Sequence, residues 1–178
     1  MEVLSAAASG MAVVSLSMQL LQTIGTILAF LRDVKGAAKE LERLAALLDR
    51  LNSLVENVRD VMERQTSLQG QHFPAPLPMI FEALKSCEAS LEALSVVVKK
   101  YKKSHGGNGA ALAKLKDDIK FGFKTKDIDA FETRIQREID HLHAALGLNS
   151  TSILTTVLPV FFDINGGLNS SAFPTKAP

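Results

Sequence analysis

The 178-residue sequence has no tryptophan, one tyrosine and one cysteine. The single cysteine, Cys87, excludes an internal disulfide and fits a reducing compartment. A net charge of +1 gives no global reason to expect nucleic acid or acidic substrates as partners. Hydrophobic residues make up 47% of the chain, with leucine and alanine dominant. This composition is ordinary for a globular protein and indicates one helical domain with a real core.

The chain also lacks the motifs of common catalytic and nucleotide-binding sites. The glycines that follow His105 precede no Lys-Ser/Thr pair and follow no predicted strand, so they do not form a P-loop. His141 and His143 are two residues apart on a predicted helix and therefore point in different directions. His72 and His105 fall in predicted loops, which disfavours a shared metal site. We therefore expect no enzymatic activity, no metal site and no cofactor.

Charge is missing from the whole run of residues 3–31, whereas Arg32 and Asp33 follow at once. About 20 apolar residues span a bilayer, but Ser, Thr and Gln lower the insertion tendency of this run and no anchor precedes it. Glu2 is the only early charge and the apolar run is long, so a secretory signal peptide is disfavoured. Three alternatives remain: a permanent span, a buried bundle helix, and a helix that is buried at rest and inserted after a trigger.

Helical spacing divides this run into two stripes. The apolar stripe comprises Leu4, Ala8, Met11, Val14, Met18, Leu21, Gly25, Leu28 and Leu31. The weakly polar stripe beside it comprises Ser5, Ser9, Ser15, Gln19, Gln22 and Thr26. A helix that is uncharged on every face predicts burial against other helices, and it is also able to enter a membrane.

Three later segments, residues 37–65, 78–101 and 128–146, have the spacing of amphipathic helices. Their apolar stripes are Leu41, Leu44, Leu48, Leu51, Val55, Val58 and Met62; Ile80, Leu84, Cys87, Leu91, Leu94, Val98 and Tyr101; and Ile128, Phe131, Ile135, Ile139, Leu142 and Leu146. Prolines between the first two segments predict an extended connection, and Pro78 suits a first helical turn. Cys87 lies on a core stripe, which indicates a small buried side chain rather than a reactive thiol.

Two segments between and after these helices follow a weaker pattern. Residues 104–109 predict a break, a further helix with Leu112, Leu115 and Ile119 follows, and residues 120–127 interrupt it. Thr125 or Asp127 is a candidate N-cap, and Gly147 a candidate end, for the last helix. Residues 149–178 predict a partly ordered tail or linker, with these candidate docking residues: Val157, Leu158, Val160, Phe161 and Phe162.

The predicted fold class is all-α: an antiparallel helical bundle of four to six helices over residues 1–148, with a hydrophobic N-terminal helix.

Lysines are concentrated in residues 99–126, a segment with nine lysines and only two acidic residues, both aspartates. The lysines are Lys99, Lys100, Lys102, Lys103, Lys114, Lys116, Lys120, Lys124 and Lys126. One interpretation is a solvated face. The other is a patch for anionic lipid, because each lysine near an acidic membrane adds about 1 kcal/mol. Few aromatic residues lie nearby and no recognition motif is present, so nucleic acid is disfavoured.

Two stretches resemble a known family. The first 58 residues resemble the N-terminal domain of many fungal STAND proteins, the NOD-like receptors of fungi, and "LAKLKDDIKFGFKTKDIDAFETRIQREIDHLHAALGL" is similar to that domain's closing helices. In residues 120–127, which interrupt the predicted helix, Phe121 stands where the family usually has tryptophan. The chain is thus identified as similar to the HeLo-like group, which is related to the HET-S HeLo domain and to the four-helix domain of mixed-lineage kinase domain-like protein.

The resemblance implies a cell-death effector of fungal innate immunity and heterokaryon incompatibility, cytoplasmic at rest, that oligomerises and permeabilises the plasma membrane through its first helix. On this chain the implied membrane-insertion residues are Leu4, Met11, Val14, Met18, Leu21, Ile24, Ile27, Leu28, Phe30 and Leu31. The implied partners are anionic membrane lipids, further copies of the chain, and the STAND receptor or other domains of a full-length protein. The assignment of the nine lysines to lipid binding rests on their charge and not on a family motif. Two alternatives are a passive interaction or dimerisation module of a larger fungal receptor and an enzyme or lipid-carrying bundle with a cavity.

Overall fold

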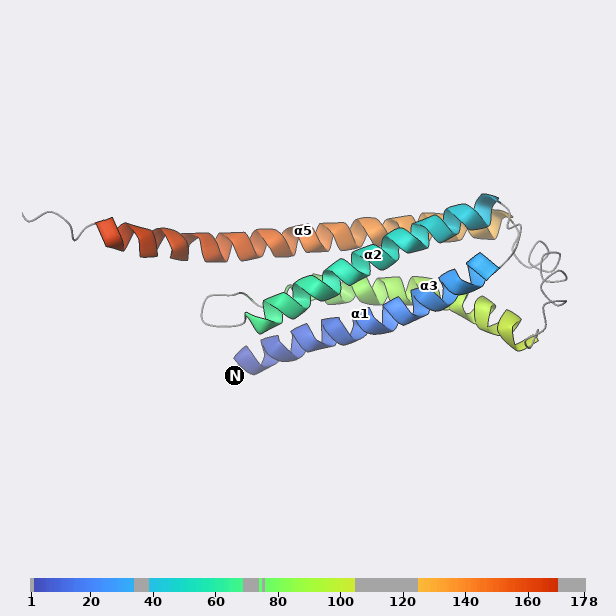
Figure 1. Ribbon diagram of the computed structural model, residues 1–178, viewed down its shortest axis with the longest axis horizontal. Coiled ribbons are helices and arrows are strands. Elements are labelled where there is room, and N and C mark those ends of the chain that lie inside the picture. Colours follow the sequence, from blue (N-terminus) through green and yellow to red (C-terminus); the bar gives the residue numbers. More distant parts are fainter. Residues whose placement is uncertain (1, 34–38, 69–73, 75, 105–124, 170–178) are drawn as a thin grey trace, which may run out of the picture.

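The structure is a computed structural model that describes residues 2–33, 39–68, 74, 76–104 and 125–169, with side chains for residues 10–33, 39–68, 74, 76–100 and 128–159. It contains the helices α1 (Glu2–Asp33), α2 (Lys39–Ser67), α3 (Pro78–Ser104) and α5 (Thr125–Asn169) (Figure 1). These described residues include no strand. The predicted all-α class and the apolar first helix are confirmed, whereas the predicted helix around Leu112 lies outside the described residues.

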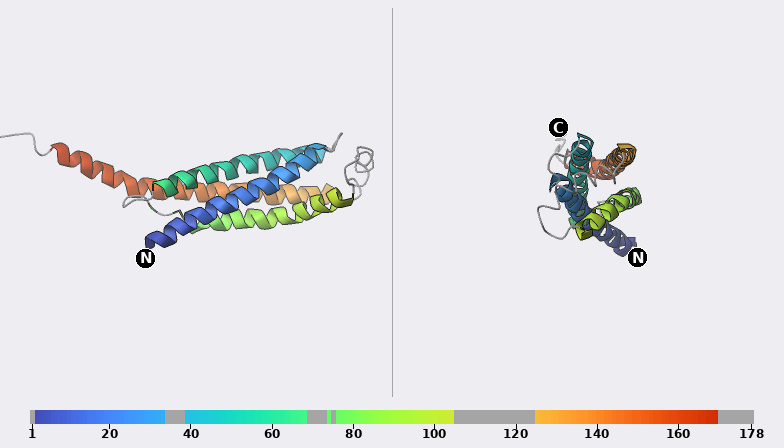
Figure 2. Two further views of the ribbon diagram at one scale, coloured as in Figure 1. Left: turned by 60° about the horizontal axis from the view of Figure 1, so that its bottom comes forward. Right: turned by 90° about the vertical axis from the view of Figure 1, so that its right-hand side faces the viewer.

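The helices share one long axis, and each runs opposite to the one before it in the described chain (Figure 1). Helix α1 packs against α2 and α3, and α5 packs against the same two helices. The end-on view in Figure 2 accordingly shows α1 and α5 at opposite corners of the bundle. Helix α1 is therefore a corner helix with one side facing outward, and not a central helix buried all round.

The amphipathic helices α2 and α3 follow their predicted stripes. All seven predicted apolar positions of α2, from Leu41 to Met62, are buried, and so are the positions from Ile80 to Val98 on α3. The Tyr101 side chain lies outside the described residues. Charged residues mark the outer face of each helix, so the apolar residues can turn inward in only one register. Pro78 begins α3, as its fixed φ predicts.

Helix α1 packs in a register that differs from the predicted one. The predicted stripe placed Met11, Met18 and Gly25 inward, but all three are exposed. The buried residues of α1 instead are Gly10, Val13, Leu16, Ser17, Leu20, Ile24, Ile27, Leu28, Phe30 and Leu31. The prediction was wrong because no charge marks the outer face, so two neighbouring apolar stripes competed and the bulkier branched side chains were buried.

Helix α5 extends beyond the predicted end at Gly147 and continues to Asn169, past the end of the other three helices (Figure 1). A glycine in a helix costs only about 1 kcal/mol, and Asn149, two residues after it, is buried in the bundle. The threonines that follow donate hydroxyl hydrogen bonds to carbonyls of their own helix, such as Thr151 to Gly147 at 2.9 Å. Of the predicted docking residues, Val157 is half-buried and Leu158 is exposed; the side chains of residues 160–162 lie outside the described part.

Candidate functional site

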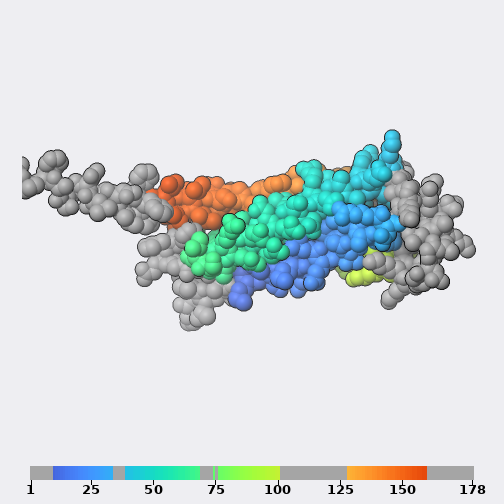
Figure 3. Space-filling view, in the orientation of Figure 1, coloured from blue at the N-terminus to red at the C-terminus, as the bar shows by residue number. Residues whose placement is uncertain are grey.

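Helix α1 combines an apolar inner face with an uncharged outer face. Its inner face contributes fully buried side chains, such as Leu20, Ile24 and Ile27, to the core shared with α2 and α3. We call the exposed residues between positions 11 and 29 the outer strip; they are Met11, Ala12, Ser15, Met18, Gln19, Gln22, Gly25, Thr26 and Ala29. Figure 3 shows α1 at the surface beside α2. No charged side chain lies on the exposed face of α1 between positions 11 and 29, so this face does not strongly favour contact with water.

Three hydroxyl groups of α1 donate hydrogen bonds within α1 itself. Ser17, although fully buried, donates its hydroxyl to the Val13 carbonyl at 2.8 Å. Thr26 donates to the Gln22 carbonyl at 2.8 Å, and Thr23 donates to the Gln19 carbonyl at 3.1 Å. An exposed carbonyl can accept this second bond without losing its helical partner. These hydroxyls would keep their hydrogen bonds if α1 moved away from the bundle.

One polar contact ties the described side chains of α1 to another helix. Arg32 donates two hydrogen bonds to the Asp49 carboxylate of α2, at 2.7 and 2.8 Å. Both side chains are about half exposed, at 61% and 49%, so the pair contributes no more than about 1 kcal/mol. It lies at the C-terminal end of α1, next to the connection to α2, and leaves the rest of α1 to apolar packing.

The other three helices are joined by buried polar contacts. On α3, Ser90 donates to the fully buried Glu138 of α5 at 2.9 Å. At the opposite end from Arg32, the Asn149 amide of α5 donates to the Gln65 side chain of α2 at 2.9 Å and accepts the Leu77 backbone N–H at 3.2 Å. Gln65 also donates to the Pro74 carbonyl at 2.8 Å. Polar bonds in such dry sites are costly to break, so α2, α3 and α5 form the more firmly joined part.

The N-terminal part of α1 lies very close to α2 at Gly10. A Cβ atom at this position would lie 2.5 Å from Thr66 Oγ1 and 3.6 Å from Thr66 Cβ. The glycine therefore allows the two helices to touch here. Thr66 Oγ1 is buried and has no hydrogen-bond partner in the described residues, so this contact contributes packing but no polar tie.

The structure divides the predicted insertion residues into three groups. Ile24, Ile27, Leu28, Phe30 and Leu31 are buried, Val14 and Leu21 are half-buried, and Met11 and Met18 are 68% and 52% exposed. The Leu4 side chain lies outside the described part. The five buried residues all lie in the second half of α1.

The predicted lysine patch is described only in part. Lys99 and Lys100 are exposed on α3. The side chains of the other seven lysines lie outside the described residues: Lys102, Lys103, Lys114, Lys116, Lys120, Lys124 and Lys126. Helix α3 ends and α5 begins at the same end of the bundle, as Figures 1 and 2 show. The convergence of the two lysine groups at that end stays a prediction.

Cys87 is fully buried between α3 and the core, so its predicted burial is confirmed. Burial, assisted by the nearby negative charge of Glu138, raises the pKa of the thiol from 9.0 to about 12.

We expect the Cys87 thiol to react very slowly with an aromatic disulfide reagent near neutral pH in the native protein and rapidly in guanidinium. Between about pH 9 and 12 the unfolded chain ionises this thiol while the native chain does not, so the group should lower stability as pH rises. Equal native and denatured labelling rates would contradict the burial.

Sequence inspection missed the buried polar residues Glu138, Gln65 and Asn149. A usable signal was present, because each continues an apolar stripe at a step of three or four residues: Glu138 follows Ile135, Gln65 follows Met62, and Asn149 follows Ala145. What no single sequence reveals is the partner of each residue, 48 residues away for Glu138 and Ser90. Among the described residues no group of three or more His, Cys, Asp or Glu side chains could hold a metal ion.

The segment Gly10–Asp33 of α1 is long and apolar enough to cross a membrane. Less than half of the residues in its most apolar 18-residue stretch are buried. Core helices and signal sequences meet the same criterion, so this finding alone does not assign a membrane role. In the comparisons with known proteins, no family model matches the sequence, and no curated protein or solved structure matches the chain.

Proposed function

We propose that this protein is a membrane-permeabilising cell-death domain of the HeLo-like type, an antiparallel bundle of four to six helices that oligomerises and inserts α1. It is cytoplasmic at rest, acts at the plasma membrane, and responds to a fungal STAND receptor or to other domains of a longer chain. In this proposal the protein acts by physically disrupting a bilayer, and it catalyses no reaction. The residues that enter the membrane are those of the inner face and outer strip of α1.

The observation that carries the proposal is the uneven attachment of the helices. Buried hydrogen bonds join α5 to α2 and to α3, whereas the described polar side chains of α1 reach another helix only through the exposed pair Arg32–Asp49. A lipid environment can replace the apolar contacts of α1, because apolar surface buried in hydrocarbon is also removed from water. The hydroxyls of Ser17, Thr23 and Thr26 would carry their hydrogen bonds with them into hydrocarbon, where unsatisfied polar groups are costly.

The lysines of residues 99–126 provide the attraction to anionic lipid in this proposal. We predict that changing Lys99, Lys100, Lys102 and Lys103 together to glutamate weakens binding to acidic vesicles at least about a hundredfold, because each lysine contributes about 1 kcal/mol near an acidic surface. Sedimentation with vesicles measures the effect. Changing Lys39, Arg50, Lys85 and Arg134, four exposed basic residues outside this group, to glutamate makes the same change in net charge and is the control. Unchanged binding of the fourfold variant would remove the lysines from the mechanism.

Leakage of a trapped dye from vesicles tests the proposed function. The intact chain, clustered through a chemically dimerised tag, should release dye from vesicles with acidic lipids and much less from neutral vesicles. The unclustered chain should release little in either case. If the clustered chain neither binds acidic vesicles nor releases their contents, the proposed function fails.

A passive interaction module of a larger receptor is the second candidate, and the uncharged outer strip of α1 favours it, because charged residues are depleted from the centres of protein interfaces. This candidate predicts a stable protein complex in solution whose mass does not change on addition of lipid. Light scattering with and without acidic vesicles separates the two functions.

A further inference from the structure

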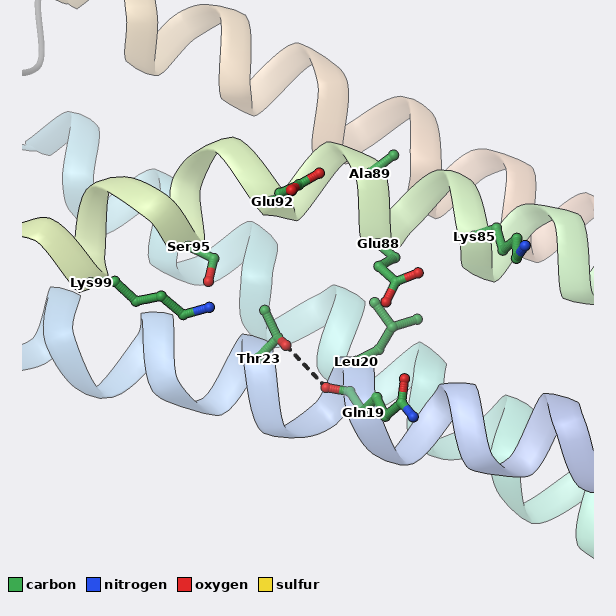
Figure 4. A pocket seen from close by; sticks show the side chains of 9 residues that line it. All are labelled: Gln19, Leu20, Thr23, Lys85, Glu88, Ala89, Glu92, Ser95 and Lys99. Carbon is green, nitrogen blue, oxygen red and sulfur yellow. Dashed lines mark hydrogen bonds between the residues drawn. The ribbon is translucent and has the colours of Figure 1, made fainter.

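The outer strip of α1 is bordered by two lines of residues at helical spacing. On α2 the line begins at Asp49, which contacts Arg32, and ends at Thr66, which contacts Gly10. It therefore follows α1 over its described length and contains, in order, Asp49, Asn52, Glu56, Arg59 and Glu63. On α3 the line consists of Lys85, Glu88, Glu92, Ser95 and Lys99, which with Gln19, Leu20 and Thr23 line a groove of about 420 Å³ (Figure 4).

The charges of the two borders are not evenly distributed. Glu88 and Glu92 lie in the middle of the α3 border, and neither is part of an ion pair or hydrogen bond within the described residues. Glu56 lies near the middle of the α2 border, where it accepts the Asn52 amide at 3.0 Å and is near Arg59, whose guanidinium pairs with Asp60 and Glu63. Lys85 and Lys99 lie at the two ends of the α3 border. The middle of the uncharged strip is thus flanked by carboxylates on both sides.

The strip itself has the shape of a helix-docking surface. A Cβ atom at Gly25 would meet no atom within 4 Å, so a partner backbone can come close to α1 there. Small side chains such as Ser15 and Ala29 leave similar space, and exposed Met18 offers a flexible apolar contact. The groove beside Leu20 can receive a side chain of the partner.

The carboxylates decide which occupant fits this surface. A second copy docked by the same strip would bring Glu56, Glu88 and Glu92 against their own equivalents, and like charges at close range oppose such contact. We infer that the outer strip of α1 in the closed bundle is a docking site for a basic amphipathic helix of a partner protein, with its apolar side on the strip and its basic residues beside Glu88 and Glu92. This inference does not depend on membrane insertion.

Isothermal titration in the absence of lipid tests the docking site. The probe is a synthetic amphipathic helix of leucine and lysine, and the same design with glutamate in place of lysine is the control peptide. The native protein should bind the lysine peptide and not the glutamate peptide. The double variant Glu88→Gln and Glu92→Gln should bind it about five- to tenfold more weakly. The matched variant Glu82→Gln, an exposed change on the outward side of α3, should bind it as the native protein does.

Three results would overturn the inference. The first is absence of binding by the native protein, and the second is equal weakening by Glu82→Gln and by the double variant, which would indicate general charge attraction. The third is binding of the glutamate peptide, and not of the lysine peptide, by the native protein. Circular dichroism of each variant establishes that the bundle is intact, and the exposed positions of the changed residues leave its core untouched. Dye-release measurements on the same variants report on the membrane function separately.

Discussion

Replacing Ile24 by alanine should lower the free energy of unfolding by about 3 kcal/mol, because the change leaves a cavity where a fully buried side chain packed. Replacing Met18, six residues earlier on the same helix, should change it by less than about 0.5 kcal/mol, because that side chain is 52% exposed. Urea unfolding followed by circular dichroism measures both values.

The contrast between these two residues tests the register of α1. Both residues were grouped as insertion residues by sequence, and the predicted apolar stripe placed Met18 on the inner face. A large loss of stability from Met18→Ala together with a small one from Ile24→Ala would restore the predicted stripe and contradict the observed register. It would also remove the basis for the outer strip.

Replacing Asn149 by alanine should lower the free energy of unfolding by about 3 kcal/mol as well, but for a different reason. The change leaves the Gln65 side-chain oxygen and the Leu77 N–H without partners in a buried site, and each unsatisfied group costs about 1–3 kcal/mol. It also removes the contact that holds α5 just after Gly147. We therefore expect a loss of helical signal in addition to the loss of stability.

Asn57→Ala is the matched control, because Asn57 is an exposed asparagine in the interior of α2. Alanine has the higher helix propensity, so this variant should be as stable as the native protein or slightly more stable. If Asn149→Ala proves as mild as Asn57→Ala, the buried amide contacts do not hold α5 to the bundle. A double-mutant cycle with Gln65→Ala would then show no coupling between the two residues.

Sequence patterns predict the helices well where charge marks one face. In α2 and α3 the charged residues leave a single apolar stripe, and the buried residues from Leu41 to Met62 follow it. Helix α1 has no such mark, so spacing alone could not choose between the stripe of Met11 and Met18 and the stripe of Leu20 and Ile24. The choice depends on how well each stripe fills the space between α2 and α3, which is a property of the assembled bundle.

Two other features depend on contacts between distant parts of the chain. Gly147 resembles a helix end, but Asn149 finds its partner Gln65 84 residues away, and this contact keeps α5 in the bundle beyond the glycine. The acidic borders of the outer strip likewise become a feature only when α2 and α3 lie on either side of α1. Their residues are ordinary exposed positions in the sequence of each helix.

The release of α1 from the bundle can be tested directly by a reversible covalent link between α1 and α2. A Cβ atom at Gly10 would lie 3.6 Å from Thr66 Cβ, which is within the range of disulfides. The variant Gly10→Cys and Thr66→Cys should therefore form this link on oxidation, while the buried Cys87 thiol, whose pKa is about 12, should not compete. The single variant Thr66→Cys is the control.

The measurement is dye release from acidic vesicles by the clustered protein before and after reduction of the link. We predict that the oxidised double variant releases almost no dye, that reduction restores release to the native level, and that the single variant releases dye under both conditions. Equal release by the oxidised and reduced forms of a fully linked double variant would contradict the proposal that α1 leaves the bundle to enter the membrane.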